Sequence, residues 1–176
     1  MPVHHTIVES PLGAITLVAH DGMLAGLYFA GHTRPLYTTA FGERRTAGFE
    51  AALEQLAEYF RRERTTFDLP LAPRGSGFQH RVWELLRRIP YGETRSYGEL
   101  AVELGDRRLA RAVGTANGSN PLGIIVPCHR VIGADGRLGG YAGGVDRKRF
   151  LLELEGAVPR ELALEARVAR ANDRIR

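Results

Sequence analysis

Cysteine is nearly absent from this chain of 176 residues, which contains only one. A single cysteine cannot form an internal disulfide, and it cannot supply the paired ligands of a CxxC-type zinc site. No apolar run reaches the roughly 18 residues that a membrane helix needs, and the N-terminus lacks the basic-then-apolar pattern of a secretory signal peptide. We therefore expect a cytoplasmic protein that does not associate with membranes and is not held together by disulfides.

Lysine is also scarce, because Lys148 is the only one and arginine supplies almost all of the positive charge. Residues 1–76 carry 7 Arg against 8 Asp and Glu, whereas residues 77–160 carry 13 Lys and Arg against 9 Asp and Glu. A basic second half favours a polyanionic partner such as nucleic acid, although a surplus of this size is weak support alone. The composition, 44% hydrophobic and 25% charged, is typical of one globular body or two small domains.

The first 74 residues predict a β-meander followed by one helix. Three runs of β-forming residues are separated by turn-forming residues; these runs are Thr6–Val8, Ala14–Ala19 and Leu24–Phe29. Residues 31–47 show no periodicity and predict a loop, whereas residues 48–62 place apolar side chains at helical spacing. A short strand is predicted at Phe67–Leu71, and the prolines and glycine around its end indicate a domain boundary.

The second half predicts three helices, of which the last two form a helix-turn-helix. Apolar residues from Phe78 to Ile89 form one helical stripe. Ser96 and Glu99 have the spacing of a capping box, which begins a short helix with the inward-facing residues Tyr97, Leu100, Ala101 and Leu104. After a tight turn, a third helix is predicted from Arg107 to Ala116.

The third predicted helix has two unlike faces. One is apolar and is expected to be buried, and it consists of Leu109, Ala112, Val113 and Ala116. The other combines arginine with very small residues, namely Arg107, Ala110, Arg111, Gly114 and Gly118. Small residues let a backbone approach a partner closely, and arginines contact phosphates or bases. We interpret this face as a DNA-contacting surface, the alternative being an ordinary solvated face.

The single cysteine follows an apolar run. Residues 123–126 predict a short buried strand, which leads into the sequence Pro127-Cys128-His129-Arg130-Val131. A neighbouring basic group can lower the pKa of a thiol and create a nucleophile, although most single cysteines are simply small buried residues. Because adjacent residues on a strand point to opposite faces, His129 alone does not decide between these two interpretations.

The sequence around the cysteine resembles the core motif of the O6-alkylguanine-DNA alkyltransferases, also called methylated-DNA–protein-cysteine methyltransferases. The likeness is strong over residues 75–157, whereas residues 1–74 resemble the family's N-terminal domain only in pattern. Further motifs of the family occur in the same order and spacing: Ile89-Pro90-Tyr91-Gly92-Glu93-Thr94, Ser96-Tyr97, Arg111-Ala112-Val113-Gly114, Asn120-Pro121, Gly140-Tyr141-Ala142-Gly143-Gly144 and Leu151 to Gly156.

The resemblance implies an α+β fold with two domains. Residues 1–74 would form a small ribonuclease-H-like domain with a β-meander and a helix. Residues 75–157 would form a mainly helical DNA-binding and alkyl-transfer domain that contains the helix-turn-helix. Residues 158–176 have no clear counterpart in the family, and we expect them to form a partly disordered tail.

The resemblance also implies direct-reversal DNA repair with five catalytic residues. Cys128 would take the alkyl group from O6-alkylguanine, with O4-alkylthymine as a second candidate substrate. Its proton would pass through a water to His129, which Glu155 holds in place. Tyr97 would donate toward guanine N3, and Asn120 would join the recognition helix to the cysteine segment. The thioether product resists water, so each molecule would act once, and neither a metal nor another cofactor is expected.

The expected partner is double-stranded DNA that carries O6-alkylguanine. The reactive carbon lies inside the base stack, so the nucleotide has to be flipped out, and Arg111 matches the family's arginine finger that fills the gap. Other residues implied to contact DNA are Ala110, Gly114, Arg107, Thr94 and Ser96. The implied pocket consists of Val126, Pro127, Val131 and a mobile wall of Tyr141, Ala142 and Gly143. We expect a monomer in solution, and cooperative clustering on DNA remains open.

Two positions depart from the pattern of some family members. Gly123 replaces a proline beside the pocket and Ala142 replaces a serine, which predicts a roomier or less polar pocket. Two other functions remain as alternatives. A thiol hydrolase that uses Cys128 and His129 would leave Arg111, Tyr97 and the helix-turn-helix without a role. A transcription regulator would use the helix-turn-helix and contain an inert cysteine.

Overall fold

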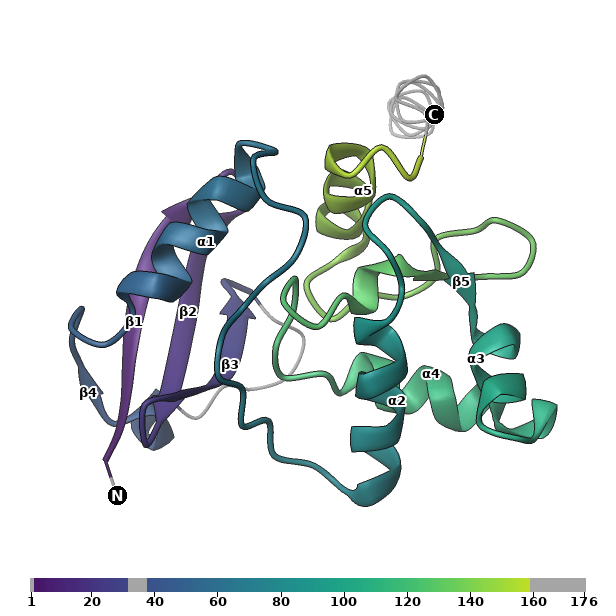
Figure 1. Cartoon of the computed structure of the whole chain (residues 1–176), viewed down its shortest axis with the longest axis horizontal. Helices are drawn as coiled ribbons and strands as arrows, with labels where there is room; N and C mark the ends of the chain where they lie inside the picture. Colours follow the sequence, from purple (N-terminus) through teal and green to yellow (C-terminus); the bar gives the residue numbers. More distant parts are fainter. Residues whose placement is uncertain (1, 32–37, 159–176) are drawn as a thin grey trace, which may run out of the picture.

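The structure, a computed structural model, describes residues 2–31 and 38–158. Two lobes lie side by side, one built on a β-sheet with a helix along it and the other mainly helical (Figure 1). The expected tail at residues 158–176 lies outside the described residues except for its first residue. Within the described part of the chain, no helix is long and apolar enough to cross a membrane.

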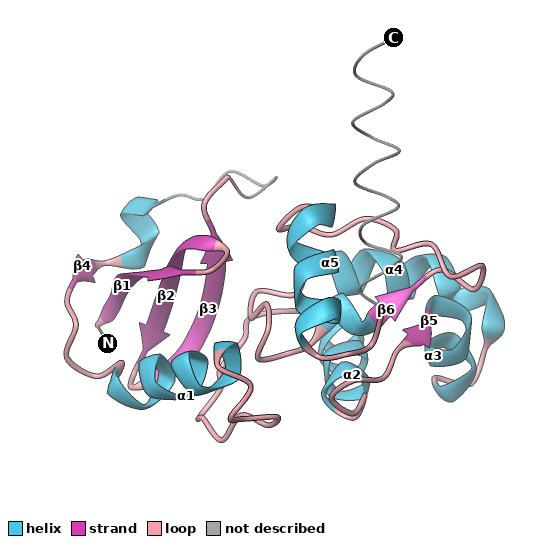
Figure 2. Ribbon diagram, turned by 90° about the horizontal axis from the view of Figure 1, so that it is seen from above, coloured by secondary structure: helices cyan, strands magenta, loops and turns pink. Residues whose placement is uncertain are grey.

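The N-terminal lobe is a four-stranded sheet covered on one face by a helix. The strands β1 (Val3–Ser10), β2 (Gly13–His20) and β3 (Met23–Phe29) are antiparallel, which confirms the predicted meander. The helix α1 (Glu50–Phe60) lies along this sheet (Figures 1 and 2). It buries Ala52, Leu56 and Tyr59 in the same core that contains the apolar residues of β2 and β3.

Two predictions for this lobe need correction. The segment 31–47 is not all loop, because its described part contains the 3₁₀ turn η1 (Thr38–Phe41) and the strand β4 (Glu43–Arg44), which pairs in parallel with the free edge of β1. The run Phe67–Leu71 is not a strand, since only its last residue forms a bridge, to Leu24 of β3. The nearby prolines lack the N–H groups that a longer ladder requires.

The C-terminal lobe is built from short helices around the segment that contains Cys128. Its helices are α2 (Gly77–Arg87), α3 (Tyr97–Glu103), α4 (Ala110–Gly118) and α5 (Val145–Leu154). The predicted capping box begins α3: the Ser96 hydroxyl accepts from the Glu99 amide at 3.1 Å, and the Glu99 carboxylate accepts from the Ser96 amide at 2.6 Å. Two very short strands, β5 (Arg95–Ser96) and β6 (Val131–Ile132), pair in parallel beside α3 (Figure 2).

The predicted strand at residues 123–126 is wrong. This apolar segment is a tight buried turn, in which the Val126 amide bonds to the Leu122 carbonyl at 2.9 Å and Ile124 has a φ of 70°. The side-chain amide of Asn120 donates to the Val126 carbonyl at 2.7 Å, so a polar backbone group of the turn is satisfied locally. A short apolar run indicates that a segment is buried, but it does not show whether the segment is a strand or another buried structure.

The buried face of α4 is also shifted from the predicted one. Ala112 is exposed and Leu109 is only half-buried, whereas Val113, Ala116 and Asn117 are buried. The residues before α4 form a separate 3₁₀ turn, η2 (Arg107–Leu109). Because a 3₁₀ turn advances by a different angle per residue than an α-helix, the predicted stripe does not continue in phase through both elements.

The two lobes are joined through strand β3. The Leu27 amide donates to the Pro121 carbonyl at 2.8 Å, and Leu27 forms a parallel bridge with Leu122 in the C-terminal lobe. Leu27 and Leu122 are both buried, and the apolar core runs without interruption from the sheet to the helices. Strand β3 therefore places the N-terminal lobe directly against the segment that leads to Cys128.

Candidate active site around Cys128

Cys128 begins the 3₁₀ turn η3 (Cys128–Arg130) at one side of a pocket of about 410 Å³. The pocket lies between α3, α4 and the segment that precedes α5. It is lined by Tyr97, Gly114, Asn117, Gly118, Asn120, Cys128, Gly140, Tyr141 and Ala142. Because residues 128–130 form a 3₁₀ turn, the expectation that Cys128 and His129 point to opposite faces of a strand does not apply.

Two asparagines hold the backbone of the cysteine segment. Asn117 of α4 donates to the Cys128 carbonyl at 3.3 Å. Asn120 donates to the Val126 carbonyl at 2.7 Å and accepts from the Leu122 amide at 3.0 Å. These bonds connect the end of α4 to both sides of the buried turn, so the position of the thiol is coupled to the helix-turn-helix.

His129 belongs to a buried network centred on Glu155. The histidine Nε2 lies 2.7 Å from Glu155 Oε1, and the Tyr59 hydroxyl donates to the same oxygen at 2.7 Å. Arg130 donates to both carboxylate oxygens, at 2.9 and 3.0 Å, and to the Ile89 carbonyl at 2.7 Å. The side chains of His129 and Glu155 are fully buried, so the carboxylate is stabilised only by protein donors.

This network fixes the protonation states of its members. Burial alone would raise the pKa of Glu155, but hydrogen bonds and charges from His129 and Arg130 lower it to about 2. Burial lowers the pKa of His129, against the opposing effect of Glu155. We infer a neutral histidine that donates through Nε2 to the carboxylate. Its Nδ1, buried and without a hydrogen-bond partner in the described chain, is then an unprotonated base.

The thiol of Cys128 is a proton donor in the resting state. It is 6% exposed, and burial raises its pKa. Asn120, Lys148 and Tyr141 act in the opposite direction because each favours the thiolate. A buried thiol with a raised pKa needs a base to become a nucleophile, and the unprotonated nitrogen of His129 is a base of the right kind.

Lys148 is a site residue that the sequence analysis missed. It is fully buried on α5, and its ammonium donates to the Val131 carbonyl at 2.6 Å and more weakly to the Gly140 carbonyl at 3.4 Å. Burial lowers its pKa to about 8, while the neighbouring Cys128 acts to raise it. The sequence did contain a signal for its burial. Lys148 is the only lysine of the chain, and it lies three residues before the apolar pair Leu151 and Leu152, on the same helical face as Leu151.

The structure brings some of the expected residues to the pocket and not others. The pocket surface includes the expected residues Tyr97, Gly114, Asn120, Cys128, Tyr141 and Ala142. The expected pocket residues Val126, Pro127, Val131 and Gly143 are buried and are not among the residues that line it. The carbonyls of Val126 and Val131 accept hydrogen bonds from Asn120 and Lys148. His129 and Glu155 are buried and are not among the residues that line the pocket.

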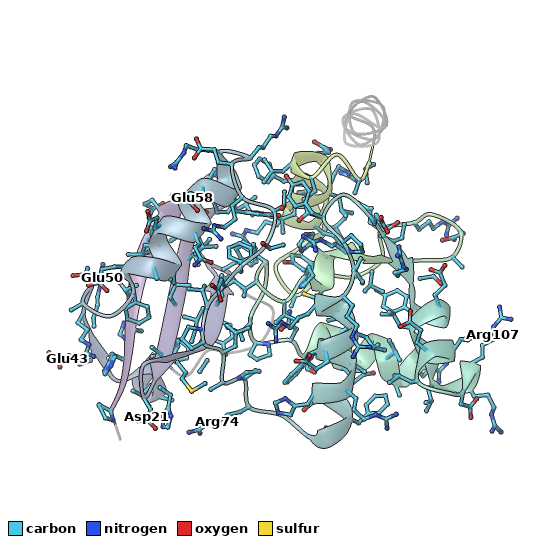
Figure 3. All side chains as sticks on the ribbon, viewed as in Figure 1. Asp21, Glu43, Glu50, Glu58, Arg74 and Arg107 are labelled. Carbon is cyan, nitrogen blue, oxygen red and sulfur yellow. The ribbon has the colours of Figure 1, made fainter. Side chains whose placement is uncertain are left out.

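The expected DNA-contacting residues lie on or near the helix-turn-helix. Arg107 and Arg111 are exposed, and Figure 3 shows Arg107 pointing away from the rest of the lobe. Ala110 and Gly114 are half-buried on α4, and Gly114 also borders the pocket. Thr94 and Ser96 are half-buried at the start of the motif, where the Ser96 hydroxyl caps α3.

The described residues offer no cluster of side chains suited to binding a metal ion. Among the described residues, no group of three or more His, Cys, Asp or Glu side chains could hold a metal ion. The titratable residues around Cys128 are instead used in hydrogen bonds to one another and to backbone carbonyls.

Two family models together match nearly all of the described chain. The ribonuclease-like domain of 6-O-methylguanine DNA methyltransferase matches residues 3–73, and its DNA-binding domain matches residues 77–157. A methylated-DNA–protein-cysteine methyltransferase of Mycolicibacterium paratuberculosis is 52% identical over 153 residues, covering 87% of this chain and 92% of that protein. A protein with the same name from Methanosarcina acetivorans is 46% identical, covering 88% of this chain and 99% of that protein.

Solved structures agree with these sequence matches. The crystal structure of O6-methylguanine methyltransferase from Mycobacterium tuberculosis has a TM-score of 0.82 and 49% identity, covering 92% of this chain and 98% of that chain. A second structure from the same organism, in complex with DNA, has a TM-score of 0.81 and 52% identity, covering 86% of this chain and 92% of that chain. The expected α+β fold, with a ribonuclease-like domain followed by a helical DNA-binding domain, is confirmed.

Proposed function

This chain belongs to the family of methylated-DNA–protein-cysteine methyltransferases, and we propose that Cys128 is the residue that accepts the alkyl group. The protein binds DNA and repairs alkylated DNA by direct transfer of the alkyl group to itself. The observation that carries the assignment of Cys128 is its position. The only cysteine of the chain borders the pocket beside the helix-turn-helix and precedes a buried histidine–glutamate pair.

We place the domain boundary between residues 74 and 75.

The proposed reaction is an in-line displacement at the alkyl carbon of O6-alkylguanine. The sulfur of Cys128 forms a bond to that carbon, and the carbon–oxygen bond breaks with its electron pair going to the base. The thiol proton moves through a water to Nδ1 of His129, and the Glu155 carboxylate stabilises the resulting imidazolium. The imidazolium passes this proton back through the water to the leaving guanine, whose negative charge the Tyr97 hydroxyl stabilises by donating a hydrogen bond to N3. Lys148 favours the thiolate that attacks.

The product explains why the protein should act only once. An alkylated cysteine is a thioether, and water does not cleave a thioether as it cleaves the thioester of an acyl-transfer enzyme. The thiol hydrolase alternative therefore predicts repeated turnover, whereas our proposal predicts a stoichiometric limit. The regulator alternative predicts binding without any covalent change to the protein.

The test of the function is intact-protein mass spectrometry after incubation with excess duplex that carries one O6-methylguanine. We expect a single mass increase equal to one methyl group in place of one hydrogen. The increase should map to Cys128 and stop at one equivalent. An unchanged mass with folded protein and intact lesion would contradict the proposal and favour the regulator. Repeated removal of lesions by one molecule would favour the hydrolase.

For DNA, we propose that Arg111 enters the stack where the alkylated nucleotide has left it. The residue is exposed on α4, and its neighbours on that face are the small residues Ala110 and Gly114, which allow the helix to approach a groove closely. The flipped nucleotide would then enter the pocket that begins at Gly114 and Tyr97.

Arg111→Ala should slow repair more than it weakens binding. We expect a transfer rate lower by roughly a hundredfold, because refilling the base stack is worth a few kcal/mol and about 1.4 kcal/mol is a tenfold change in rate. The affinity for unmodified duplex should weaken at most about threefold, because one phosphate contact is lost. Single-turnover kinetics and titration of fluorescent duplex at one salt concentration measure the two effects. Arg61→Ala, at the C-terminal end of α1 in the other lobe, is the charge-matched control. Equal losses of rate and affinity would count against the finger.

A further inference from the structure

One arginine connects the N-terminal lobe to the wall of the pocket that Tyr141, Ala142 and Gly143 form. Arg147 lies in the first turn of α5, three residues after the N-cap Gly144. Its Nε donates to the Leu12 carbonyl at 3.1 Å, in the turn between β1 and β2. Its Nη1 donates to the Gly143 carbonyl at 2.9 Å. A single guanidinium therefore bridges a backbone group of each lobe.

An aromatic contact lies beside this bridge. Arg147 stacks over Phe29 at the end of β3, with 5.1 Å between the guanidinium carbon and the ring centroid. The Phe29 ring lies 6.3 Å from the ring of Tyr141, measured between centroids, with a tilt of 56°. Tyr141 lines the pocket and influences the thiol of Cys128. The contacts thus form one path from the sheet to the reacting atom.

The packing at Gly143 shows how tightly the wall is held. A Cβ at this position would lie 2.6 Å from the Phe29 ring and 2.9 Å from the Tyr141 ring, both far inside normal contact distance. Only glycine fits where the wall passes between these two rings. Gly144, the next residue, has a φ of 93° and bonds through its amide to the Tyr141 carbonyl at 2.8 Å.

We propose that Arg147 is a positioning residue, through which Leu12 and Phe29 of the N-terminal lobe hold the pocket wall of Tyr141–Gly143 in place for alkyl transfer. The proposal rests on the proposed function and assigns the N-terminal lobe a part in the reaction. A base that enters the pocket has to be held with its alkyl carbon in line with the sulfur, and small errors in such geometry cost much of the rate. A wall that moves away lowers the fraction of productive complexes.

Arginine suits this position better than lysine does. Its planar guanidinium has five donors in fixed directions and stacks on aromatic rings, so it bonds to two carbonyls and covers Phe29 at the same time. A lysine ammonium is a single point charge that cannot reproduce this bridge. The conservative replacement is therefore informative: it retains the charge and most of the stem but loses the simultaneous contacts.

The test compares three variants of the full chain. Arg147→Met removes the donors and retains an apolar side chain, and Arg147→Lys retains the charge. Arg149→Met is the control, because Arg149 is on the same helix and pairs with Asp146 at 3.8 Å instead of with the wall. Each protein is measured for the single-turnover transfer rate at saturating alkylated duplex, duplex affinity, melting temperature, and the rate at which iodoacetamide modifies Cys128, the only cysteine.

For Arg147→Met we expect at least about tenfold slower transfer, because two charge-assisted hydrogen bonds are lost, to the Leu12 and Gly143 carbonyls, with unchanged duplex affinity. Iodoacetamide should modify Cys128 several times faster, because the wall no longer covers the thiol. Arg147→Lys should recover part of both changes, and Arg149→Met should behave as the original protein does.

Two results would overturn the positioning role. One is transfer at the original rate in Arg147→Met. The other is slower transfer with unchanged iodoacetamide reactivity, which would show that the wall still covers the thiol and that Arg147 does not act by holding it. The iodoacetamide comparison needs no DNA, so it tests the wall even if the original protein transfers no methyl group. That last outcome would count against the proposed function and not against the contact between the lobes.

Discussion

Cys128→Ser is expected to bind alkylated duplex as the original protein does and to transfer no alkyl group to itself. The hydroxyl is nearly the same size as the thiol, so the pocket and the asparagine bonds around residue 128 are retained. A serine hydroxyl is a much weaker nucleophile without a strong adjacent base. The rate should fall by a factor on the order of 10⁶, as when the nucleophile of another enzyme is removed.

The measurement combines duplex titration with intact-protein mass spectrometry under the conditions used for the original protein. Val82→Ala is the control, because it truncates a fully buried apolar side chain of α2 that does not line the pocket, and it retains the thiol. It should still become alkylated to one equivalent. Methyl transfer to the Cys128→Ser protein would show that another residue is the acceptor. Loss of duplex binding in this variant would show that the thiol has a structural role in the DNA-binding surface.

Glu155→Gln is expected to lower the free energy of unfolding by roughly 3–5 kcal/mol, the usual cost of breaking a buried ion pair. The glutamine removes the negative charge that faces the buried guanidinium of Arg130 and the imidazole of His129. It also presents an N–H group where three donors now converge. Urea unfolding of both proteins at neutral pH measures the difference, with Tyr59→Phe as a control that removes one hydrogen bond and should cost about 1 kcal/mol.

The same difference should depend on pH in a defined direction. The pKa of Glu155 is lowered from 4.5 to about 2 in the folded protein, so its carboxylate contributes fully above pH 4.5. That contribution declines as the pH falls from 4.5 toward 2, because the unfolded chain takes up the proton first. The stabilities of the original protein and Glu155→Gln should therefore converge over this range. A difference that stays constant as the pH falls would contradict the assignment of the charge to Glu155.

Elements set by local sequence were predicted well. The turn between β1 and β2, the capping box of Ser96 and Glu99, and the apolar stripe of α2 each depend on residues within a few positions of one another. The buried turn at residues 123–126 was not predicted, because its hydrogen bonds depend on the side chain of Asn120, and an apolar run does not contain that information. Ala112 was misplaced because the buried face of α4 is centred on Val113, Ala116 and Asn117, and a polar residue such as Asn117 is not counted in an apolar stripe.

Residues of the candidate site could be predicted from the sequence only where they belong to a recognisable motif. Cys128, His129 and Asn120 lie in or beside quoted motifs, whereas the contributions of Tyr59 and Lys148 depend on packing between distant segments. Tyr59 reaches Glu155 across 96 positions of the chain, and no local pattern records such a contact. The sequence indicated the burial of Lys148 only indirectly, because this lysine occupies a position of α5 where the helical spacing of Leu151 and Leu152 predicts an apolar residue.

The hydrogen bond from Tyr59 to Glu155 also limits how far the two halves of this protein are modular. The hydroxyl comes from α1 and the carboxylate from the end of α5. Both lobes therefore contribute side chains to the hydrogen-bond network around Glu155, beside Cys128. A chimera that combines the C-terminal half with the N-terminal half of a distant relative would need a donor at the place of Tyr59. Such grafts should also need the contacts that Leu12, Leu27 and Phe29 make with the C-terminal half, but without a donor at the place of Tyr59 the buried carboxylate would lose one of its partners.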